Sequence, residues 1–87
     1  MNYIFTPKAE EDLDKIDNSL RVLFFKHAEK LLTDPTGKHL QHGLNDYVEK
    51  VTKQARMPYK IEGNTIYLLR CFATHKEYEK WLQSQRR

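Results

Sequence analysis

PYKIEGNTIYLLRCFATHKEY, residues 58–78, combines two apolar runs, a short polar break and a helix start. The two runs are rich in aromatic and β-branched side chains, which favour strands. The EGN triplet at 62–64 between them is typical of a hairpin turn. Thr74 is followed three residues later by Glu77, which is the capping-box pattern of a helix N-terminus. The stretch therefore predicts a β-hairpin that leads directly into a C-terminal helix beginning at His75.

The N-terminal part of the chain predicts a strand followed by a hairpin of two helices. NYIF at 2–5 is short and aromatic, and Thr6 then supplies an N-cap before Pro7 at the first helical position. The DNS triplet at 17–19 separates the two helices, and the second helix ends before Pro35. Apolar residues recur every three or four positions, at Ala9, Leu13 and Ile16 and then at Leu20, Leu23, Phe24, Ala28, Leu31 and Leu32.

The rest of the chain predicts three more strands. Residues 36–46 have the composition of a loop, whereas 47–51, 55–61 and 65–72 are rich in strand-forming residues. Pro58 in the middle strand lacks a ladder donor, which favours an edge position or a bulge. We therefore expect an α+β fold of order β-α-α-β-β-β-α. It would comprise a small antiparallel twisted sheet of about four strands, with the helical hairpin packed on one face and a short C-terminal helix.

Length and composition indicate one small globular domain, residues 1–87. With 39% hydrophobic and 31% charged residues and only three glycines, the chain is neither of low complexity nor fibrous. The single cysteine, Cys71, cannot form an internal disulfide, so a reducing cytoplasm is expected. No segment approaches the roughly 18 consecutive apolar residues of a membrane span, and the N-terminus lacks a signal-peptide pattern. Neither export nor membrane insertion is indicated.

Charge is unevenly distributed along the chain. Residues 1–46 contain six Lys/Arg and eight Asp/Glu, a net charge of −2, whereas residues 47–87 contain nine and four, a net charge of +5. Cations with interleaved aromatic rings suit an anionic partner such as RNA, although a solvated surface is the simpler alternative. Tyr78, Trp81 and Leu82 recur at helical spacing, which favours packing of Tyr78 in the core over contact with a base.

The join between the last predicted strand and helix favours chemistry at a phosphate. His75 lies in the first turn of the helix, five residues after Arg70, where backbone amides are unpaired and the helix dipole is positive. Cleavage of RNA without a metal requires removal of the 2′-hydroxyl proton, cations at the phosphate and protonation of the leaving 5′-oxygen. Lysine, arginine and histidine can supply all three.

Metal and cofactor sites are not indicated. The chain has no CxxC, no HExxH, no paired acidic cluster and no glycine-rich phosphate loop. His39 and His42 are three residues apart but lack cysteine or acidic companions. His27 lies on the apolar stripe of the second helix and is interpreted as a structural histidine. We therefore expect neither a metal nor a cofactor.

The element order and the C-terminal motif resemble the RelE/ParE superfamily of toxins from bacterial and archaeal toxin-antitoxin systems. Residues 58–78 are similar to the YafQ-type end, in which a Tyr-Lys strand, a turn and an apolar strand with a late Arg precede Thr-His. KHLQHG at 38–43 is similar to the His-containing loop of that branch. The chain departs from the branch pattern because the stretch 70–75 is one residue longer, and because Gln54 lies near the place of an acidic group.

This resemblance implies a toxin of a type II toxin-antitoxin system. Such a toxin of the RelE and YafQ type is a ribosome-dependent endoribonuclease that cuts mRNA in the A site by metal-independent 2′-hydroxyl attack and so inhibits translation. Its partners would be a cognate antitoxin, the ribosome and mRNA. The main alternative is a ParE-like toxin that binds DNA gyrase without cutting RNA, since one fold serves both activities. An inactive, antitoxin-binding relic is a third interpretation.

The resemblance also implies roles for individual residues. His75 would act as general acid or base, and Arg56 would steady the scissile phosphate together with Arg70. Lys50 or Lys53 would help to activate the nucleophile, and the choice between these two lysines stays open. Contacts with the substrate are expected from Lys60, Tyr78 and His39.

The register of the last hairpin decides whether the two arginines act together. A turn that uses all three residues of 62–64 would pair Ile61 with Thr65 and place Arg56 opposite Arg70 on one face. A two-residue turn would place them on opposite faces. We expect the three-residue turn, which makes a two-arginine phosphate clamp.

Overall fold

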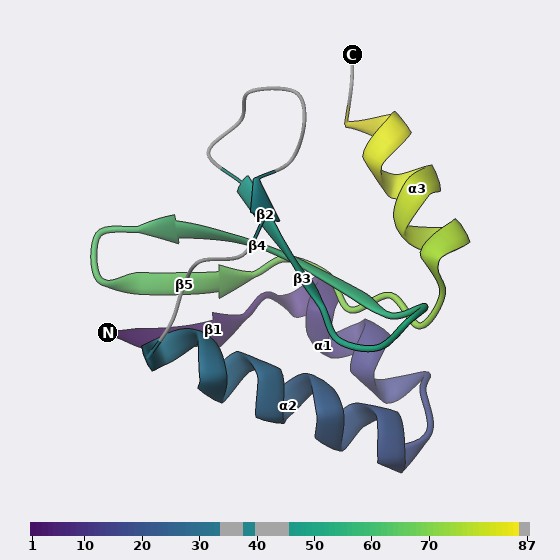
Figure 1. Ribbon diagram of the computed structural model, residues 1–87, viewed down its shortest axis with the longest axis horizontal. Helices are drawn as coiled ribbons and strands as arrows, with labels where there is room; N and C mark the ends of the chain where they lie inside the picture. Colours follow the sequence, from purple (N-terminus) through teal and green to yellow (C-terminus); the bar gives the residue numbers. More distant parts are fainter. Residues whose placement is uncertain (34–37, 40–45, 86–87) are drawn as a thin grey trace.

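The computed structural model describes residues 1–33, 38–39 and 46–85. Its helices are α1 (Pro7–Asp14), α2 (Asn18–Thr33) and α3 (His75–Ser84), and its strands are β1 (Asn2–Phe5), β2 (Lys38–His39), β3 (Asp46–Lys50), β4 (Arg56–Glu62) and β5 (Thr65–Leu68). Helices α1 and α2 pack as a hairpin on one side of the sheet, and α3 lies on the other side (Figure 1). The predicted α+β class is confirmed, and the two-residue strand β2 is an addition to the predicted order.

The sheet is mixed, with strand order β1-β5-β4-β3-β2. Strand β1 pairs parallel to β5, with Tyr3 opposite Ile66, whereas all other neighbouring strands are antiparallel. The expectation of an antiparallel sheet is therefore wrong for β1. The two strands are joined by residues 6–64, which include the helical hairpin and three other strands, and a long connection permits parallel pairing whereas a tight turn does not.

Two apolar clusters attach the helices to the sheet. The larger cluster lies between the hairpin and the sheet and includes the fully buried side chains of Phe24, Met57 and Tyr59. The smaller cluster lies between the sheet and α3, where Val48, Trp81 and Leu82 pack on Phe72 and Tyr78. The predicted apolar stripe of the hairpin is buried at Ala9, Leu13, Phe24, Ala28 and Leu31. Helix α3 is thus attached to the sheet through a single apolar stripe.

Polar side chains fix the starts of α1 and α3. Thr6 Oγ1 accepts the backbone N–H of Ala9 at 3.2 Å, and Pro7 occupies the first helical position. Thr74 and Glu77 form a capping box in which each side chain bonds the backbone N–H of the other residue. Each such cap typically contributes about 1 kcal/mol to stability. Both predicted helix starts are confirmed.

The turn between β4 and β5 has two residues, Gly63 and Asn64, rather than the three predicted. Ile61 pairs with Ile66 and not with Thr65, so the predicted register is wrong. Gly63 has a φ of 59°, and it is the single described residue with a positive value. A positive φ at the first central position alone defines a type II′ hairpin turn, and glycine adopts it without steric cost.

A bulge lies opposite Pro58 of the central strand β4, in the segment 69–71 that follows β5. Tyr59 pairs with Leu68 and Arg56 pairs with Phe72, so two intervening residues of β4 face three residues of the following chain. The carbonyl oxygen of Pro58 is bonded to this bulged segment, so the missing N–H of the proline faces the same segment. A bulge therefore occurs at the level of Pro58, but its extra residue belongs to the partner segment and not to the predicted strand. The edge alternative is wrong because β4 is the middle strand.

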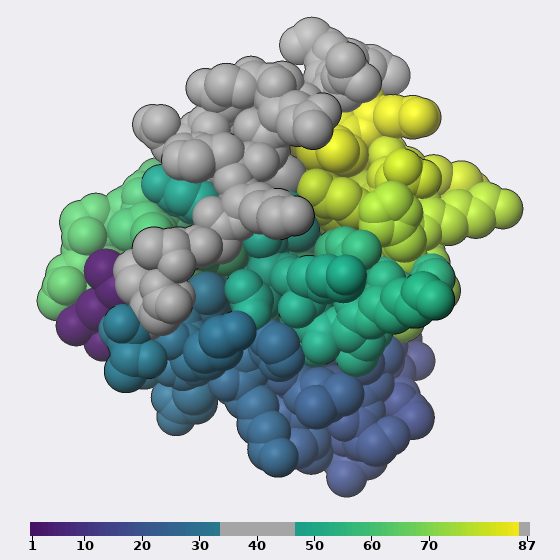
Figure 2. Space-filling view, viewed as in Figure 1, coloured from purple at the N-terminus to yellow at the C-terminus, as the bar shows by residue number. Residues whose placement is uncertain are grey.

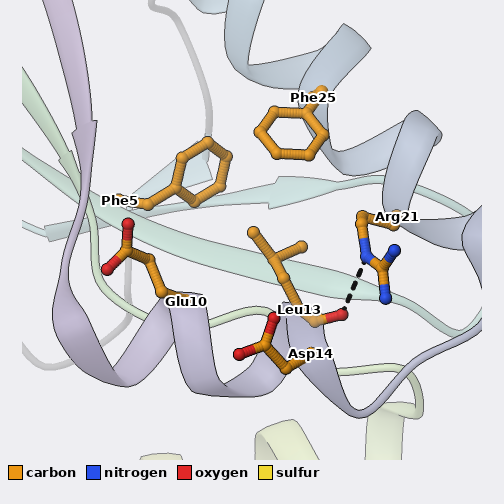
Figure 3. Close-up of a pocket in the computed structure, with 6 residues that line it drawn as sticks. All are labelled: Phe5, Glu10, Leu13, Asp14, Arg21 and Phe25. Atoms are coloured by element: carbon orange, nitrogen blue, oxygen red, sulfur yellow. Dashed lines mark hydrogen bonds between the residues drawn. The ribbon is translucent and has the colours of Figure 1, made fainter.

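A pocket of about 420 Å³ opens on the hairpin side, between α1, α2 and β1 (Figure 3). Its lining residues are Phe5, Glu10, Leu13, Asp14, Arg21 and Phe25. Arg21 joins the two helices, because its Nε donates to the carbonyl oxygen of Leu13 at 3.0 Å. No residue predicted to take part in function lines this pocket. It is therefore separate from the candidate site on the other side of the sheet.

Candidate active site on the α3 side of the sheet

The pairing of β3 with β4 places two predicted site residues, Lys50 and Arg56, on the side of the sheet that faces α3. Val48 packs in the α3 cluster. The next residue, Glu49, lies on the hairpin side, where its Oε2 is 2.6 Å from Nδ1 of His27. Lys50 therefore returns to the α3 side. Arg56 is directly opposite Lys50 in the β3–β4 register and shares its face. The contact with Glu49 also agrees with the structural interpretation of His27.

The guanidinium of Arg56 is held by the turn that precedes it. Its Nη1 donates to the carbonyl oxygens of Thr52, Lys53 and Ala55 at 3.0, 3.1 and 3.0 Å. Among the residues that the structure describes, no acceptor is bonded to Nε or Nη2. One edge of the guanidinium is thus fixed to the backbone, and the other edge is available for a bidentate anion.

His75 is the first residue of α3, and its side chain is 41% exposed. Its backbone N–H donates to Oε1 of Gln54 at 3.4 Å, so the β3–β4 turn contacts the helix N-terminus. Its ring Nδ1 lies 3.6 Å from Oε1 of Glu79, and its ring centroid lies 5.8 Å from that of Tyr78. The imidazole is therefore accessible, and it lies at the positive end of the α3 dipole.

Tyr78 is near His75 and is close enough to Arg56 to be affected by its charge. Its side chain is buried and packs on Phe72 and Trp81, as its helical spacing predicts. Burial raises the pKa of Tyr78 above its ordinary value of 10.0, and the positive charge of Arg56 opposes part of this rise. Tyr78 is therefore neutral at physiological pH and can donate a hydrogen bond from its hydroxyl.

The other predicted site residues lie around this group. Lys53 is exposed in the β3–β4 turn and contributes its carbonyl oxygen to Arg56. Lys60 is four residues from Arg56 along β4, about 13 Å away, and its Nζ lies 3.1 Å from Oε2 of Glu62. His39 belongs to β2, and its side chain lies outside the described residues. The strand register thus brings Lys50 and Arg56 together, and the turn that holds Arg56 contacts the backbone of His75 through Gln54.

Arg70 does not join Arg56. Its Nε and Nη2 bind the two carboxylate oxygens of Asp12 on α1 at 2.7 and 3.0 Å, and this hydrogen bonding raises the pKa of Arg70. Its guanidinium carbon lies 4.8 Å from the ring centroid of Phe72. The predicted two-arginine clamp is therefore wrong, because the two-residue turn and the bulge place Arg56 opposite Phe72. Arg70 instead secures the hairpin to the sheet.

Cys71, next to Arg70, gives the protein a pH-dependent contribution to stability. Burial chiefly raises the pKa of its thiol well above the ordinary value of 9.0. Above that pH the unfolded chain loses this proton while the folded chain keeps it, so the free energy of unfolding falls as pH rises. We expect a fall of about 1 kcal/mol between roughly pH 9 and 10 in urea unfolding. Cys71→Ala should make this slope clearly smaller, and an equal slope in the variant would contradict the assignment.

The described part of the chain contains neither a metal-binding group nor a membrane-spanning helix. Residues 1–33, 38–39 and 46–85 contain no group of three or more His, Cys, Asp or Glu that could hold a metal ion. In the same ranges, no helix has the length and apolar character needed to cross a membrane. Figure 2 shows the β3–β4 region, in teal, at the surface between α3, in yellow, and the hairpin, in blue. The candidate site therefore combines the exposed Lys50 with the partly exposed Arg56 and His75 at the surface of this region.

Comparisons with known proteins identify the fold. No family model matches the chain, and no curated protein sequence matches it. The RelBE2 toxin-antitoxin complex from Mycobacterium tuberculosis is 24% identical with a TM-score of 0.73, over 80% of this chain and 93% of that chain. The YoeB dimer from Staphylococcus aureus is 18% identical with a TM-score of 0.68, over 82% and 93%. The chromosomal ParDE system from P. aeruginosa is 19% identical with a TM-score of 0.63, over 82% and 92%.

The chain therefore has the fold of the RelE, YoeB and ParE toxins, which confirms the predicted resemblance at the level of the fold. Toxins of all three names share this arrangement of helices and strands. A shared fold does not by itself determine an activity, because activity depends on the side chains of the site.

Proposed function

We propose that this chain is the toxin of a type II toxin-antitoxin system and a ribosome-dependent endoribonuclease. It would cut mRNA in the ribosomal A site by metal-independent attack of a ribose 2′-hydroxyl, in the cytoplasm, and so inhibit translation. A cognate antitoxin would hold it inactive. The fold that it shares with a toxin-antitoxin complex supports the toxin assignment.

The pairing of Lys50 with Arg56 carries the proposal. Like charges directly opposite each other on antiparallel strands are destabilising, so this pair weakens the sheet in the free protein. A bound anion removes the repulsion, and Nε and Nη2 of Arg56 offer further donors to it near the positive end of the α3 dipole. A phosphodiester meets these requirements, and His75 adds a group that can transfer a proton.

Each group has a task in the proposed reaction. Arg56 would bind the non-bridging oxygens of the scissile phosphate and stabilise the charge that develops there. Lys50, which faces Arg56 as Lys53 does not, would stabilise the 2′-oxygen as it loses its proton. His75 would act as general base at the 2′-hydroxyl or as general acid at the leaving 5′-oxygen. The 2′-oxygen bonds to phosphorus and the bond to the 5′-oxygen breaks, which leaves a 2′,3′-cyclic phosphate and a 5′-hydroxyl.

A ParE-like toxin that binds gyrase is the second candidate function. The similarity to the ParDE system supports it, because that system shares the fold over most of its length. Gyrase binding does not require a histidine at the start of α3 beside an arginine. His75 and Arg56 together therefore favour the nuclease.

Induced expression of the wild type and of His75→Ala, followed by mapping of mRNA ends on translating ribosomes, tests the proposal. We expect A-site cleavage by the wild type and a cleavage rate lower by about 100-fold or more in His75→Ala, because general acid–base catalysis typically contributes that much. Lys26→Ala, an exposed cation on α2, is the control and should cleave at the wild-type rate.

The alternative outcomes separate the competing functions. Intact transcripts together with DNA-damage signalling would indicate gyrase poisoning, and normal growth with both proteins would indicate an inactive relic. Cleavage that survives His75→Ala at full rate would show that the enzyme class is right and the mechanism wrong.

A further inference from the structure

The turn between β3 and β4, residues 51–55, connects the two groups that the proposed reaction needs. Arg56 follows the turn directly and is bonded back to it through Nη1. Gln54 within the turn accepts the backbone N–H of His75 at the start of α3. The conformation of this turn therefore sets the position of Arg56 relative to His75.

The hydroxyl of Thr52 holds the turn in this conformation. Its Oγ1 accepts the backbone N–H of Ala55 at 2.9 Å and that of Gln54 at 3.2 Å. Threonine side chains commonly close turns in this way. Ala55 is fully buried, so its N–H has no access to water and needs this acceptor. Removal of the hydroxyl alone would release two amides at once.

The same turn directs three carbonyl oxygens at one nitrogen of Arg56. The carbonyls of Thr52, Lys53 and Ala55 all lie within 3.1 Å of Nη1, and that nitrogen carries two hydrogens. Shared donors of this kind fix the plane of the guanidinium as well as its place. If the turn relaxes, the carbonyls diverge, and the edge formed by Nε and Nη2 loses its direction.

We propose that Thr52 is a positioning residue for Arg56: its hydroxyl shapes the 51–55 turn so that the free edge of the guanidinium faces the scissile phosphate. This inference rests on the proposed function, because it assigns Thr52 a task in the same reaction. Thr52 itself touches neither the reacting atoms nor the substrate. Its effect passes through the backbone of the turn to Arg56.

Kinetics on programmed ribosomes with the full-length protein test the role. Thr52→Val removes the hydroxyl and keeps the side-chain shape, whereas Thr52→Ser keeps the hydroxyl. We expect Thr52→Val to lower kcat by about 10-fold to 100-fold with KM within about threefold, since misplacement of a group by about 1 Å costs this much. Thr52→Ser should retain a rate near that of the wild type. Thr33→Val, which removes an exposed hydroxyl at the end of α2, is the matched control and should retain the wild-type rate.

A double-mutant cycle distinguishes positioning from a general loss of structure. If Thr52 acts through Arg56, Thr52→Val should have little further effect on kcat in an Arg56→Ala background. An undiminished effect in that background, or an unchanged kcat in the single variant, would overturn the proposal. Equal losses in Thr52→Val and Thr52→Ser would overturn it as well.

Nuclear magnetic resonance of the Arg56 side chain provides a readout independent of cleavage. In the wild type the three carbonyls hinder rotation of the guanidinium, so Nη1 and Nη2 should give separate signals. A single averaged signal in the wild type would overturn the proposal, and this result does not depend on whether Thr52→Val folds. In folded Thr52→Val the two signals should merge, and persistent separation would count against a role for the hydroxyl. If the wild type cuts no mRNA, the proposed function fails, whereas these signals still decide whether Thr52 orders Arg56.

Discussion

Replacement of Arg56 by alanine should slow mRNA cleavage on ribosomes by about 100-fold or more while leaving the protein folded. Loss of a single preorganised donor at a developing negative charge typically costs this much in rate. The structural cost should be smaller, about 1 kcal/mol, because the guanidinium is bonded to carbonyl oxygens of its own surface turn and not to another element of the fold. Single-turnover cleavage of mRNA and urea unfolding measure the two effects separately.

Two companion variants define the cause of the Arg56 effect. Arg56→Lys keeps the charge but lacks the planar pair of donors, so it should recover only part of the lost rate. Lys26→Ala removes an exposed cation from α2 and should leave the rate unchanged. Comparable losses in Arg56→Ala and Lys26→Ala would show that net charge matters and that the specific site does not.

The local elements of this fold could be predicted because their signals span only a few residues. Thr6 and Pro7 mark the start of α1, and Thr74 with Glu77 marks the start of α3. In each case the residues that signal the helix start are next to the helix in the chain. The same holds for His75, whose position in the first turn of α3 follows from the cap alone. These features do not depend on how the strands pair.

The register of the sheet could not be predicted in this way, because it depends on differences of a single residue. A turn of two residues instead of three moves each partner by one position, and the bulge beside Pro58 shifts the pairing again, so Arg56 meets Phe72. The contact of Arg70 with Asp12 joins residues 58 positions apart, and nothing near either residue signals the other. The role of Thr52 had a local signal, a hydroxyl two residues after a strand and at the start of a tight turn, which favours this type of hydrogen bonding.

Replacement of Asp12 by alanine should lower the free energy of unfolding by about 3 kcal/mol, the largest stability effect that we expect among the polar residues. Asp12 accepts two hydrogen bonds from Arg70 and a third, at 2.9 Å, from the backbone N–H of Cys71. Its carboxylate and the guanidinium are both largely withdrawn from water, with side-chain exposures of 13% and 26%. The variant therefore leaves a poorly solvated cation and an amide without their acceptor. Urea unfolding at neutral pH measures the loss, and Asp14→Ala, at an exposed position two residues away, should change stability by less than about 0.5 kcal/mol.

A double variant separates the two parts of the Asp12 effect. In Asp12→Ala with Arg70→Met, no unpaired charge remains, so part of the stability lost in the single variant should return. The recovery should be incomplete, because the N–H of Cys71 still lacks the acceptor that Asp12 supplied. Full recovery would show that the ion pair accounts for the whole effect. If the stability lost in the double variant equals the sum of the losses in Asp12→Ala and Arg70→Met, Asp12 and Arg70 act independently. The attachment of the helical hairpin to the end of β5 would then not depend on their contact.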